Sequence, residues 1–419
     1  MTQSAAAIAA APFFGGRVVR AAFVLAMFGW GIGFYGPPVY LHAVIERTGW
    51  PLAWVSAAVT LHYLFGALVV AQLPRLHARC GVGATAVAGA TLATLGVLGW
   101  ALCDRPWQLM LAALLSGGGW VTMGAVAVNA VIAPWFVRTR PAALAKAYNG
   151  ASVGGVVFSP LWVALIAAWG FAGAALAVGL VTVLLMAWLN RSVFALTPQR
   201  VGQFADGLAA AAPPPCSGAE GRRLPGVQLW RDRCFRTLAL AMASGLFAQI
   251  GLLVHLFALL APVLGAQAAG FAMGLATACA IGGRHVAARS MPPHADRRIV
   301  AAAAYAVQAL GALLLCAVGT ERVALILLAI ALFGSGIGNA TSLPPLIAQQ
   351  EFAPRDVPRV VALIVALAQG TYALAPAAFG ALLQAAGAAQ LGRGTVPFLL
   401  VAAAAQLLAI GCLLAGRRR

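Results

Sequence analysis

The feature that most constrains this chain is a series of long apolar stretches, separated by short segments that contain charges, proline or glycine. A helix needs about 20 apolar residues to cross the hydrocarbon core of a bilayer, which is about 30 Å thick. Only 9% of the residues are charged, too few for the surface of a soluble domain, where the fraction is about 25%. The sequence therefore predicts an all-α polytopic membrane protein with twelve transmembrane helices. They are expected at residues 18–44, 51–73, 82–102, 107–134, 144–168, 171–193, 236–263, 267–289, 299–318, 323–347, 359–384 and 394–415.

The basic residues orient these predicted helices. Of the 27 lysines and arginines, Arg47, Arg105, Arg322 and Arg393 fall in loops on one side, and the other 23 fall on the side that carries both termini. Loops rich in lysine and arginine face the cytoplasm, so we expect both termini in the cytoplasm of a bacterium and the protein in its inner membrane. The same distribution accounts for the net charge of +18 without nucleic acid as a partner.

One polar interval divides the chain into two parts. Residues 194–235 form the only long stretch without a predicted membrane helix, and they include three consecutive prolines at 213–215. Proline clusters of this kind mark loops and linkers. We therefore predict two six-helix bundles, at residues 1–193 and 236–419, that are joined by a cytoplasmic linker.

A local pattern recurs in the two predicted bundles. Phe136 and Pro160 are separated by 24 residues, and so are Phe352 and Pro376. Paired six-helix repeats around a central substrate site are typical of major facilitator transporters, and the chain resembles this superfamily. Three segments resemble its monocarboxylate and oxalate/formate branch in particular: RTRPAALAKAYNGASVGGVVFSPL (138–161), GFYGPPVYLHAVIERTGWPLAWVSAAVTL (33–61) and GGRHVAARS (282–290).

The resemblance implies two pseudo-symmetric bundles that rock against each other. However, this chain lacks residues that the family carries at three positions. The superfamily's motif between helices 2 and 3 carries an acid before its arginine, whereas this chain has Ala78 before Arg79. In the monocarboxylate branch a lysine of helix 1 corresponds to Val39, and an acid of helix 8 corresponds to Ala280. Both proton-coupling groups of that branch are therefore missing.

Arg284 is the one fixed charge that the sequence places where it can face a central cavity. All nine acidic residues fall in predicted loops or at helix ends, and a charge within the bilayer is costly and usually functional. The lack of a buried acid argues against export of organic cations. One interpretation has the Arg284 side chain reaching the cytoplasmic interface. The other has its guanidinium binding a substrate carboxylate through two parallel hydrogen bonds.

Two histidines are candidates for proton coupling, because imidazole titrates near physiological pH. His62 is expected in the middle of the second predicted helix, and His255 lies late in the seventh. Each could instead be a neutral histidine that is hydrogen-bonded between helices. The proton could also travel on the substrate acid itself.

A broken helix predicts further substrate contacts. Gly36, Pro37 and Pro38 must kink or unwind the first helix, which makes Tyr35 and Tyr40 candidates. Further polar and aromatic residues are also candidate substrate contacts: Trp120, Asn149, Gln249, His255, Asn339, Gln369 and Tyr372. Each of them could instead serve packing or an interhelical hydrogen bond. Gating is predicted for three basic residues on the cytoplasmic side: Arg79, Arg138 and Arg140.

These observations predict a secondary active transporter of a small organic anion, a mono- or dicarboxylate, that works by proton symport or anion exchange. The alternative is a permease or exporter of a neutral or zwitterionic solute, such as a sugar derivative or siderophore-like compound, with Arg284 only structural. A membrane sensor would need a signalling domain, and an enzyme would need a nucleophile, metal cluster or paired carboxylates in the bilayer. The seven cysteines are scattered singly, so we expect neither a metal nor a cofactor. We expect a monomer whose partners are the solute and the bilayer.

Overall fold

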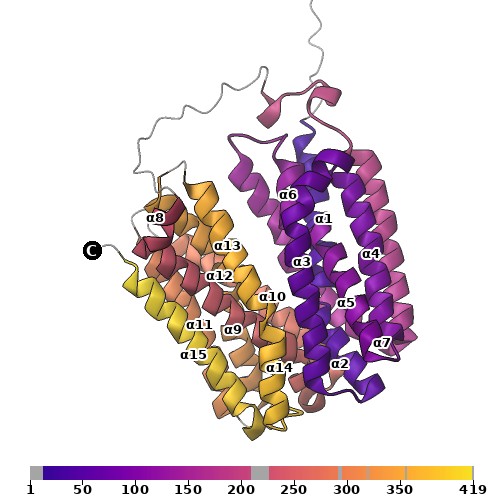
Figure 1. Cartoon of the computed structure of the whole chain (residues 1–419), viewed down its shortest axis with the longest axis vertical. Helices are drawn as coiled ribbons and strands as arrows, with labels where there is room; N and C mark the ends of the chain where they lie inside the picture. Colours follow the sequence, from indigo (N-terminus) through magenta and orange to yellow (C-terminus); the bar gives the residue numbers. More distant parts are fainter. Residues whose placement is uncertain (1–12, 209–225, 291–294, 319, 354–355, 418–419) are drawn as a thin grey trace, which may run out of the picture.

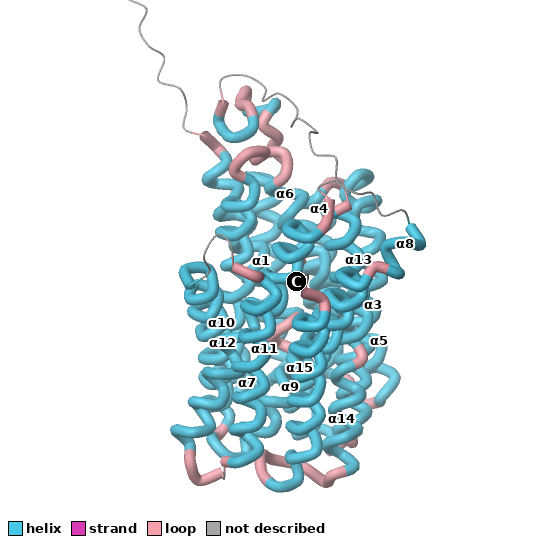
Figure 2. Tube along the Cα trace, turned by 90° about the vertical axis from the view of Figure 1, so that its left-hand side faces the viewer, coloured by secondary structure: helices cyan, strands magenta, loops and turns pink. Residues whose placement is uncertain are grey.

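The computed structural model describes residues 13–208, 226–290, 295–318, 320–353 and 356–417. All regular structure in these ranges is helical, as predicted (Figure 2). The first half contains α1 (Gly15–Gly33), α2 (Pro37–Thr48), α3 (Leu52–Cys80), α4 (Val82–Leu102), α5 (Pro106–Trp120), η1 (Val121–Met123), α6 (Ala125–Ile132), α7 (Arg140–Leu189), η2 (Asn190–Phe194), η3 (Gln199–Val201) and η4 (Ala205–Gly207). The second half contains α8 (Gly226–Arg231), α9 (Arg233–Leu264), α10 (Ala266–Ser290), α11 (Arg297–Ala317), α12 (Val323–Glu351), α13 (Val357–Ala373), α14 (Ala375–Ala385), η5 (Arg393–Thr395) and α15 (Val396–Ala415). Residues 209–225 of the predicted linker lie outside the described ranges.

Eleven helical segments of the described chain are long and apolar enough to cross a membrane. One of them, Arg140–Phe194, has 55 residues, which at 1.5 Å per residue is about 80 Å, far more than one crossing needs. Its backbone leaves the helical region at Gly170, with φ 70° and ψ 169°, in the φ range that favours glycine. Gly170 therefore separates the two spans predicted at 144–168 and 171–193, and the described helices account for all twelve.

Three of the predicted spans are interrupted instead of continuous. α1 and α2 are separated at residues 34–36, just before Pro37 and Pro38, where the sequence predicted a break. Gly124, in an extended conformation, separates η1 from α6. α13 and α14 meet at Leu374, and a proline in the first turn starts α14. Non-helical residues therefore lie within spans that the sequence predicted as continuous helices.

The helices form two groups that lie side by side (Figure 1). In the first group α1 packs on α7 and α4 on α5, and in the second α12 packs on α10 and α11, and α15 on α11. Small residues allow close approach within a group. A Cβ on Gly117 of α5, for example, would lie 2.2 Å from the His62 carbonyl oxygen of α3. Helices are thus held at short range around the polar side chains described below.

The two groups contact each other along α7 and α10, and α3 meets the second group at one end of the molecule. We call the end that carries residues 194–208 and α8 the linker end, and the other the opposite end (Figure 1). Near the opposite end, the Ala53 N–H of α3 donates to Gln384 Oε1 of α14 at 2.9 Å. At the linker end of α3, by contrast, Leu73 is the one buried side chain among residues 68–80. The second group therefore covers α3 near the opposite end and leaves its last turns exposed.

Asp206 attaches the first part of the predicted linker to the first helix group. Its carboxylate accepts hydrogen bonds from the N–H groups of Val137, Arg138 and Thr139, and from the Thr139 hydroxyl at 2.6 Å. Its own N–H donates to the Trp135 carbonyl, and its φ of 58° lies in the left-handed region. Burial raises the pKa of Asp206, but the hydrogen bonds outweigh this effect and lower it to about 2. Asp206 is therefore ionised and holds the loop that precedes α7.

Candidate functional site

Arg284 lies where α10 of the second group faces α7 of the first. Its Nη2 donates a hydrogen bond to Ser152 Oγ of α7, and its Nε packs against α12, 2.7 Å from where a Cβ on Gly338 would lie. Within the described ranges, no carboxylate lies within 4.0 Å of this guanidinium. Arg284 is thus a partly buried charge with a neutral partner from the other helix group.

The contact with Ser152 places the Arg284 guanidinium inside the molecule. Ser152 lies 12 residues after the start of α7, about 18 Å along the first arm of that helix. The arm continues to Gly170, about 27 Å further at the same rise per residue. The guanidinium therefore lies well within the span of this arm, away from both of its ends.

Tyr35 and Thr277 join the same contact between the helix groups. Tyr35 follows α1, is 6% exposed and lies beside Thr277 of α10. Gly155 of α7 leaves room for both, because a Cβ there would lie 2.6 Å from Tyr35 and 2.5 Å from Thr277. Sequence reasoning missed Thr277 and Ser152, although Thr277 precedes Arg284 by seven residues and so shares its face of α10.

An aromatic cluster lies beside Tyr35. We use this name for five rings: Trp30, Phe34, Tyr63, Trp120 and Tyr372. Tyr63 contacts Trp120 with ring centroids 6.3 Å apart and, across the two groups, Tyr372 at 6.0 Å. Trp120 is 6% exposed, and its Nε1 is buried without a hydrogen-bond partner in the described structure. Unpaired buried donors are rare in native proteins, which marks Trp120 as a candidate ligand contact.

His62 connects three helices of the first group. Its Nε2 lies 2.9 Å from the Gly33 carbonyl oxygen, and its Nδ1 lies 2.9 Å from Ser116 Oγ. A carbonyl oxygen only accepts, so we assign the imidazole proton to Nε2. The ring stacks on Trp120 with 6.0 Å between centroids and 7° between planes. Both nitrogens are therefore occupied, and His62 holds the Trp120 indole in place.

His255 lies at the contact between the groups near the opposite end. Its Nδ1 lies 2.8 Å from the Gly251 carbonyl oxygen of its own helix, α9, and its Nε2 lies 3.0 Å from Ser56 Oγ of α3. The side chain is fully buried. The structure therefore joins His255 to Ser56, in the region where Ala53 contacts Gln384.

Substituting Ser56 with alanine is expected to favour conformations in which the opposite end is open. The change removes the Ser56–His255 hydrogen bond between the groups, and one such bond contributes about 1 kcal/mol, or about a fivefold change in an equilibrium. Hydrogen–deuterium exchange of the peptide that contains Ala53 should become faster, because its N–H donates across the groups. Ser192→Ala is the control, since that hydroxyl bonds Trp188 within one helix. Unchanged exchange in Ser56→Ala would contradict the prediction.

Tyr40 and Gln249 lie inside single helix groups. Tyr40 is 1% exposed, donates to the Ile32 carbonyl at 3.1 Å and packs among rings of the first group. Gln249 accepts from Gln308 Nε2 at 3.4 Å, and Gln308 in turn accepts from Gln406 Nε2 at 3.2 Å. These three glutamines form a buried amide chain through α9, α11 and α15. Neither Tyr40 nor Gln249 is brought to Arg284 by a contact in the described structure.

Asn339 and Asn149 lie on helices that pack against α10, whereas Gln369 lies on α13. Asn339 of α12 donates to the Gly283 carbonyl of α10 at 3.3 Å, directly beside Arg284. Asn149 is exposed on α7, three residues before Ser152, and Gln369 is partly exposed on α13. Their role as substrate contacts stays a prediction.

The three predicted gating arginines lie at the linker end, and all are exposed. Arg79 is in the last turn of α3. The Arg138 N–H donates to Asp206. Arg140 donates from Nε to the Phe136 carbonyl at 2.9 Å and from Nη2 to the Ala133 carbonyl at 3.0 Å. In this structure Arg140 therefore binds carbonyl groups that follow α6, and gating stays a prediction for all three.

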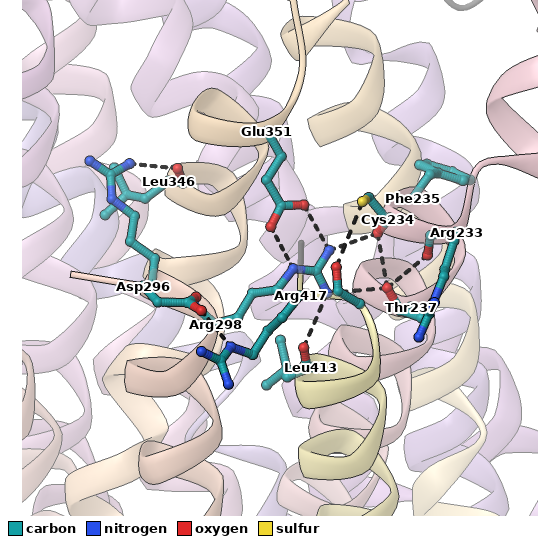
Figure 3. Close-up of polar contacts among 12 residues, drawn as sticks. Arg233, Cys234, Phe235, Thr237, Asp296, Arg298, Leu346, Glu351, Leu413 and Arg417 are labelled. Carbon is teal, nitrogen blue, oxygen red and sulfur yellow. Dashed lines mark hydrogen bonds and ion pairs between the residues drawn. The ribbon is translucent and has the colours of Figure 1, made fainter. Parts of the chain in front are cut away.

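A buried ion pair at the linker end of the second group was not predicted. Figure 3 shows Arg298 of α11 at its centre, facing Glu351, the last residue of α12. Arg298 Nε lies 2.5 Å from Glu351 Oε1 and Nη2 lies 2.8 Å from Oε2, and the Arg298 side chain is 1% exposed. Arg298 also donates to the Cys234 carbonyl at 2.9 Å and to Thr237 Oγ1 at 3.1 Å. The sequence placed Glu351 at a helix end but had no signal for its partner.

A second ion pair lies beside the first (Figure 3). Arg417 Nε lies 2.5 Å from Asp296 Oδ2, and Asp296 also accepts from the Arg298 N–H at the start of α11. Burial raises the pKa of Asp296, but the hydrogen bonds from Arg417 and Arg298 outweigh this effect and lower it. The C-terminal end of α15 is therefore attached to α11 at the linker end.

The described residues contain no group of three or more His, Cys, Asp or Glu side chains that could hold a metal. Six cysteines lie in the described ranges, and all are free. Cys216 lies outside these ranges. The groups gathered at the contact are thus a guanidinium, hydroxyls and aromatic rings, which suit binding of a solute.

Known proteins share this architecture. The family model of the Major Facilitator Superfamily matches residues 21–376. The structure of the nucleoside transporter NupG is similar with a TM-score of 0.72 and 11% identity, over 96% of this chain and 100% of that chain. A bacterial homologue of the human lysosomal transporter Spinster, in an inward-facing unoccupied conformation, has a TM-score of 0.68 and 16% identity, over 98% of this chain and 99% of that chain. Among curated protein sequences, none matches this chain.

Proposed function

We propose, from the premise that the chain belongs to the major facilitator superfamily of membrane transporters, that its solute is a small organic anion, a mono- or dicarboxylate. Arg284 would be the counter-charge that binds the carboxylate. This proposal follows the resemblance of residues 138–161, 33–61 and 282–290 to the monocarboxylate and oxalate/formate branch. We also propose that the protein is a monomer in a bacterial inner membrane, with both termini in the cytoplasm.

The observation that carries the proposal is the unpaired charge of Arg284. Its only described hydrogen bond goes to the neutral hydroxyl of Ser152, so other N–H groups of its planar fork stay available for a carboxylate. A partly buried cation without a counter-charge is unfavourable. An anionic solute would supply the missing charge with two parallel hydrogen bonds.

The same contact suggests how binding is coupled to movement of the two groups. Arg284 belongs to the second group, whereas Ser152 and Tyr35 belong to the first. We propose that residues 1–193 and 236–415 rock against each other, and that the anion exchanges with Ser152 on Arg284 during this motion. His62 and His255, both already hydrogen-bonded, or the solute acid itself, would carry a proton in symport. Anion exchange would need none.

The alternative solute is neutral or zwitterionic, with Arg284 only structural. Two observations favour it: Arg284 already has a partner in Ser152, and the similar structure NupG is a nucleoside transporter. In this case the Arg284–Ser152 hydrogen bond would persist while the solute is bound.

A thermal-shift experiment distinguishes the two solutes, because a ligand that binds the folded state raises the melting temperature. The purified protein would be heated with a panel of organic acids and a panel of sugars and nucleosides. We expect stabilisation by carboxylates, about 2.7 kcal/mol at a ligand concentration 100 times Kd, which disappears in Arg284→Ala. Stabilisation by uncharged compounds alone would contradict the proposal and support the alternative.

A further inference from the structure

We propose that the transported anion carries an aromatic ring, which lies against Trp120 and Tyr63 while its carboxylate binds Arg284. This inference rests on the proposed function and adds the class of solute to it. Two observations carry it: a series of aromatic rings runs to Trp120 from Tyr35, which lies beside Thr277 of the helix that carries Arg284, and this series contains an unpaired hydrogen-bond donor.

Tyr35 connects the charge to the aromatic cluster. Its ring lies beside Thr277, which shares a face of α10 with Arg284, because a Cβ on Gly155 would lie 2.6 Å from Tyr35 and 2.5 Å from Thr277. The Tyr35 ring lies 5.0 Å from the Phe34 ring, and Phe34 lies 6.2 Å from Tyr63. These separations are those of favourable aromatic pairs. A solute held by its carboxylate at Arg284 would therefore have its body next to aromatic rings.

The unpaired donor of the cluster is held in one orientation. Trp120 stacks on His62, and His62 is in turn hydrogen-bonded through both ring nitrogens. Gly66 of α3 packs closely against the donor, because a Cβ there would lie 3.3 Å from Trp120 Nε1. A fixed, buried N–H without a partner is unfavourable unless another molecule accepts from it. A heteroatom or the π face of a solute ring would supply that acceptor.

Several rings of the cluster keep surface that a ligand can cover. Trp30, Phe34 and Tyr372 are partly exposed. Trp30 meets Trp120 edge to face, with 6.3 Å between centroids and 81° between planes. Tyr372 comes from α13 of the second group and meets Tyr63 at 81°. The cluster thus contains ring edges and faces from both groups, and the geometry of aromatic contacts is specific for a planar ring.

The test compares two acids of similar size and equal charge, benzoate and cyclohexanecarboxylate. Isothermal titration calorimetry on the full-length protein in lipid nanodiscs would measure both dissociation constants. We expect benzoate to bind about two- to tenfold more tightly, the range that aromatic pairs add beyond burial of area. Trp120→Leu should remove this preference. Trp188→Leu is the matched control, because Trp188 is 61% exposed on α7 and should keep it.

A second variant tests the same inference in case Trp120→Leu does not fold. Tyr372→Leu removes a partly exposed ring of the other group, and it should also reduce the preference for benzoate. Equal binding of the two acids by the unsubstituted protein would overturn the aromatic inference and leave the anion proposal standing. Binding of benzyl alcohol with the affinity of benzoate would instead contradict the anion proposal while supporting the aromatic cluster. Failure of both acids to bind would overturn the aromatic inference, whereas the panel of organic acids in the thermal-shift experiment decides the anion proposal.

Discussion

Replacing Arg284 with lysine is expected to weaken carboxylate binding about 10- to 150-fold, the equivalent of one hydrogen bond to a charged group at about 1.5–3 kcal/mol. Lysine keeps the positive charge, but its ammonium lacks the planar fork that makes two parallel hydrogen bonds to a carboxylate. The guanidinium also reaches Ser152 of the other helix group. Uptake of a labelled carboxylate into proteoliposomes would measure the effect.

Two further variants test whether the effect is specific to Arg284 and what the Ser152 hydroxyl contributes. Arg289→Lys is the control, because Arg289 is exposed five residues further along α10 and should transport normally. Ser152→Ala removes the hydrogen bond between the charged guanidinium and a neutral hydroxyl, and it should change transport about 10- to 150-fold. Gel filtration would show that each variant is folded. Normal uptake by Arg284→Lys would contradict the role that we propose for the guanidinium.

Glu351→Gln is expected to lower the free energy of unfolding by about 3–5 kcal/mol, because it leaves the buried Arg298 charge without its partner. Arg298 is 1% exposed and bonds both carboxylate oxygens of Glu351 (Figure 3). The carbonyl and hydroxyl acceptors around Arg298 cannot neutralise it. Thermal unfolding of the purified protein in detergent would report the loss as a lower melting temperature.

The controls for this variant use a different ion pair and a double substitution. Asp104 lies 3.7 Å from Arg47 and is 85% exposed, so Asp104→Asn should change stability by about 1 kcal/mol or less. Replacing Arg298 with methionine and Glu351 with leucine together should be less damaging than Glu351→Gln, because no charge is left buried. A Glu351→Gln protein as stable as the unsubstituted one would contradict the predicted contribution of this ion pair.

The transmembrane helices were predicted correctly where the sequence pattern lies within one segment of the chain. The stretch predicted at 82–102 has the same bounds as α4, and the Pro37-Pro38 pair marks the break between α1 and α2. Prediction failed where geometry at a single residue matters. Nothing in the sequence distinguished Gly124 from the many other glycines, yet its extended backbone divides a predicted span.

The site shows the same limit. The sequence identified Arg284 because an arginine within an apolar stretch is unusual. It missed Ser152, which looks like one of many small residues that serve packing, and it missed the pairing of Arg298 with Glu351. Trp120 was predicted, but the stacking on His62 that fixes its N–H was not. These partners come from different helices, so no spacing along one helix reveals them.

By itself, the sequence determined that this chain is a multi-pass helical membrane protein with one arginine in a region free of acids. Run length, composition and charge position are properties of single segments, and the bilayer acts on each segment separately. Only the tertiary structure decided what that arginine contacts. Arg284 and Ser152 are 132 residues apart along the chain, and their meeting depends on the packing of whole helix groups, in which glycines such as Gly155 set how closely α7 and α10 approach.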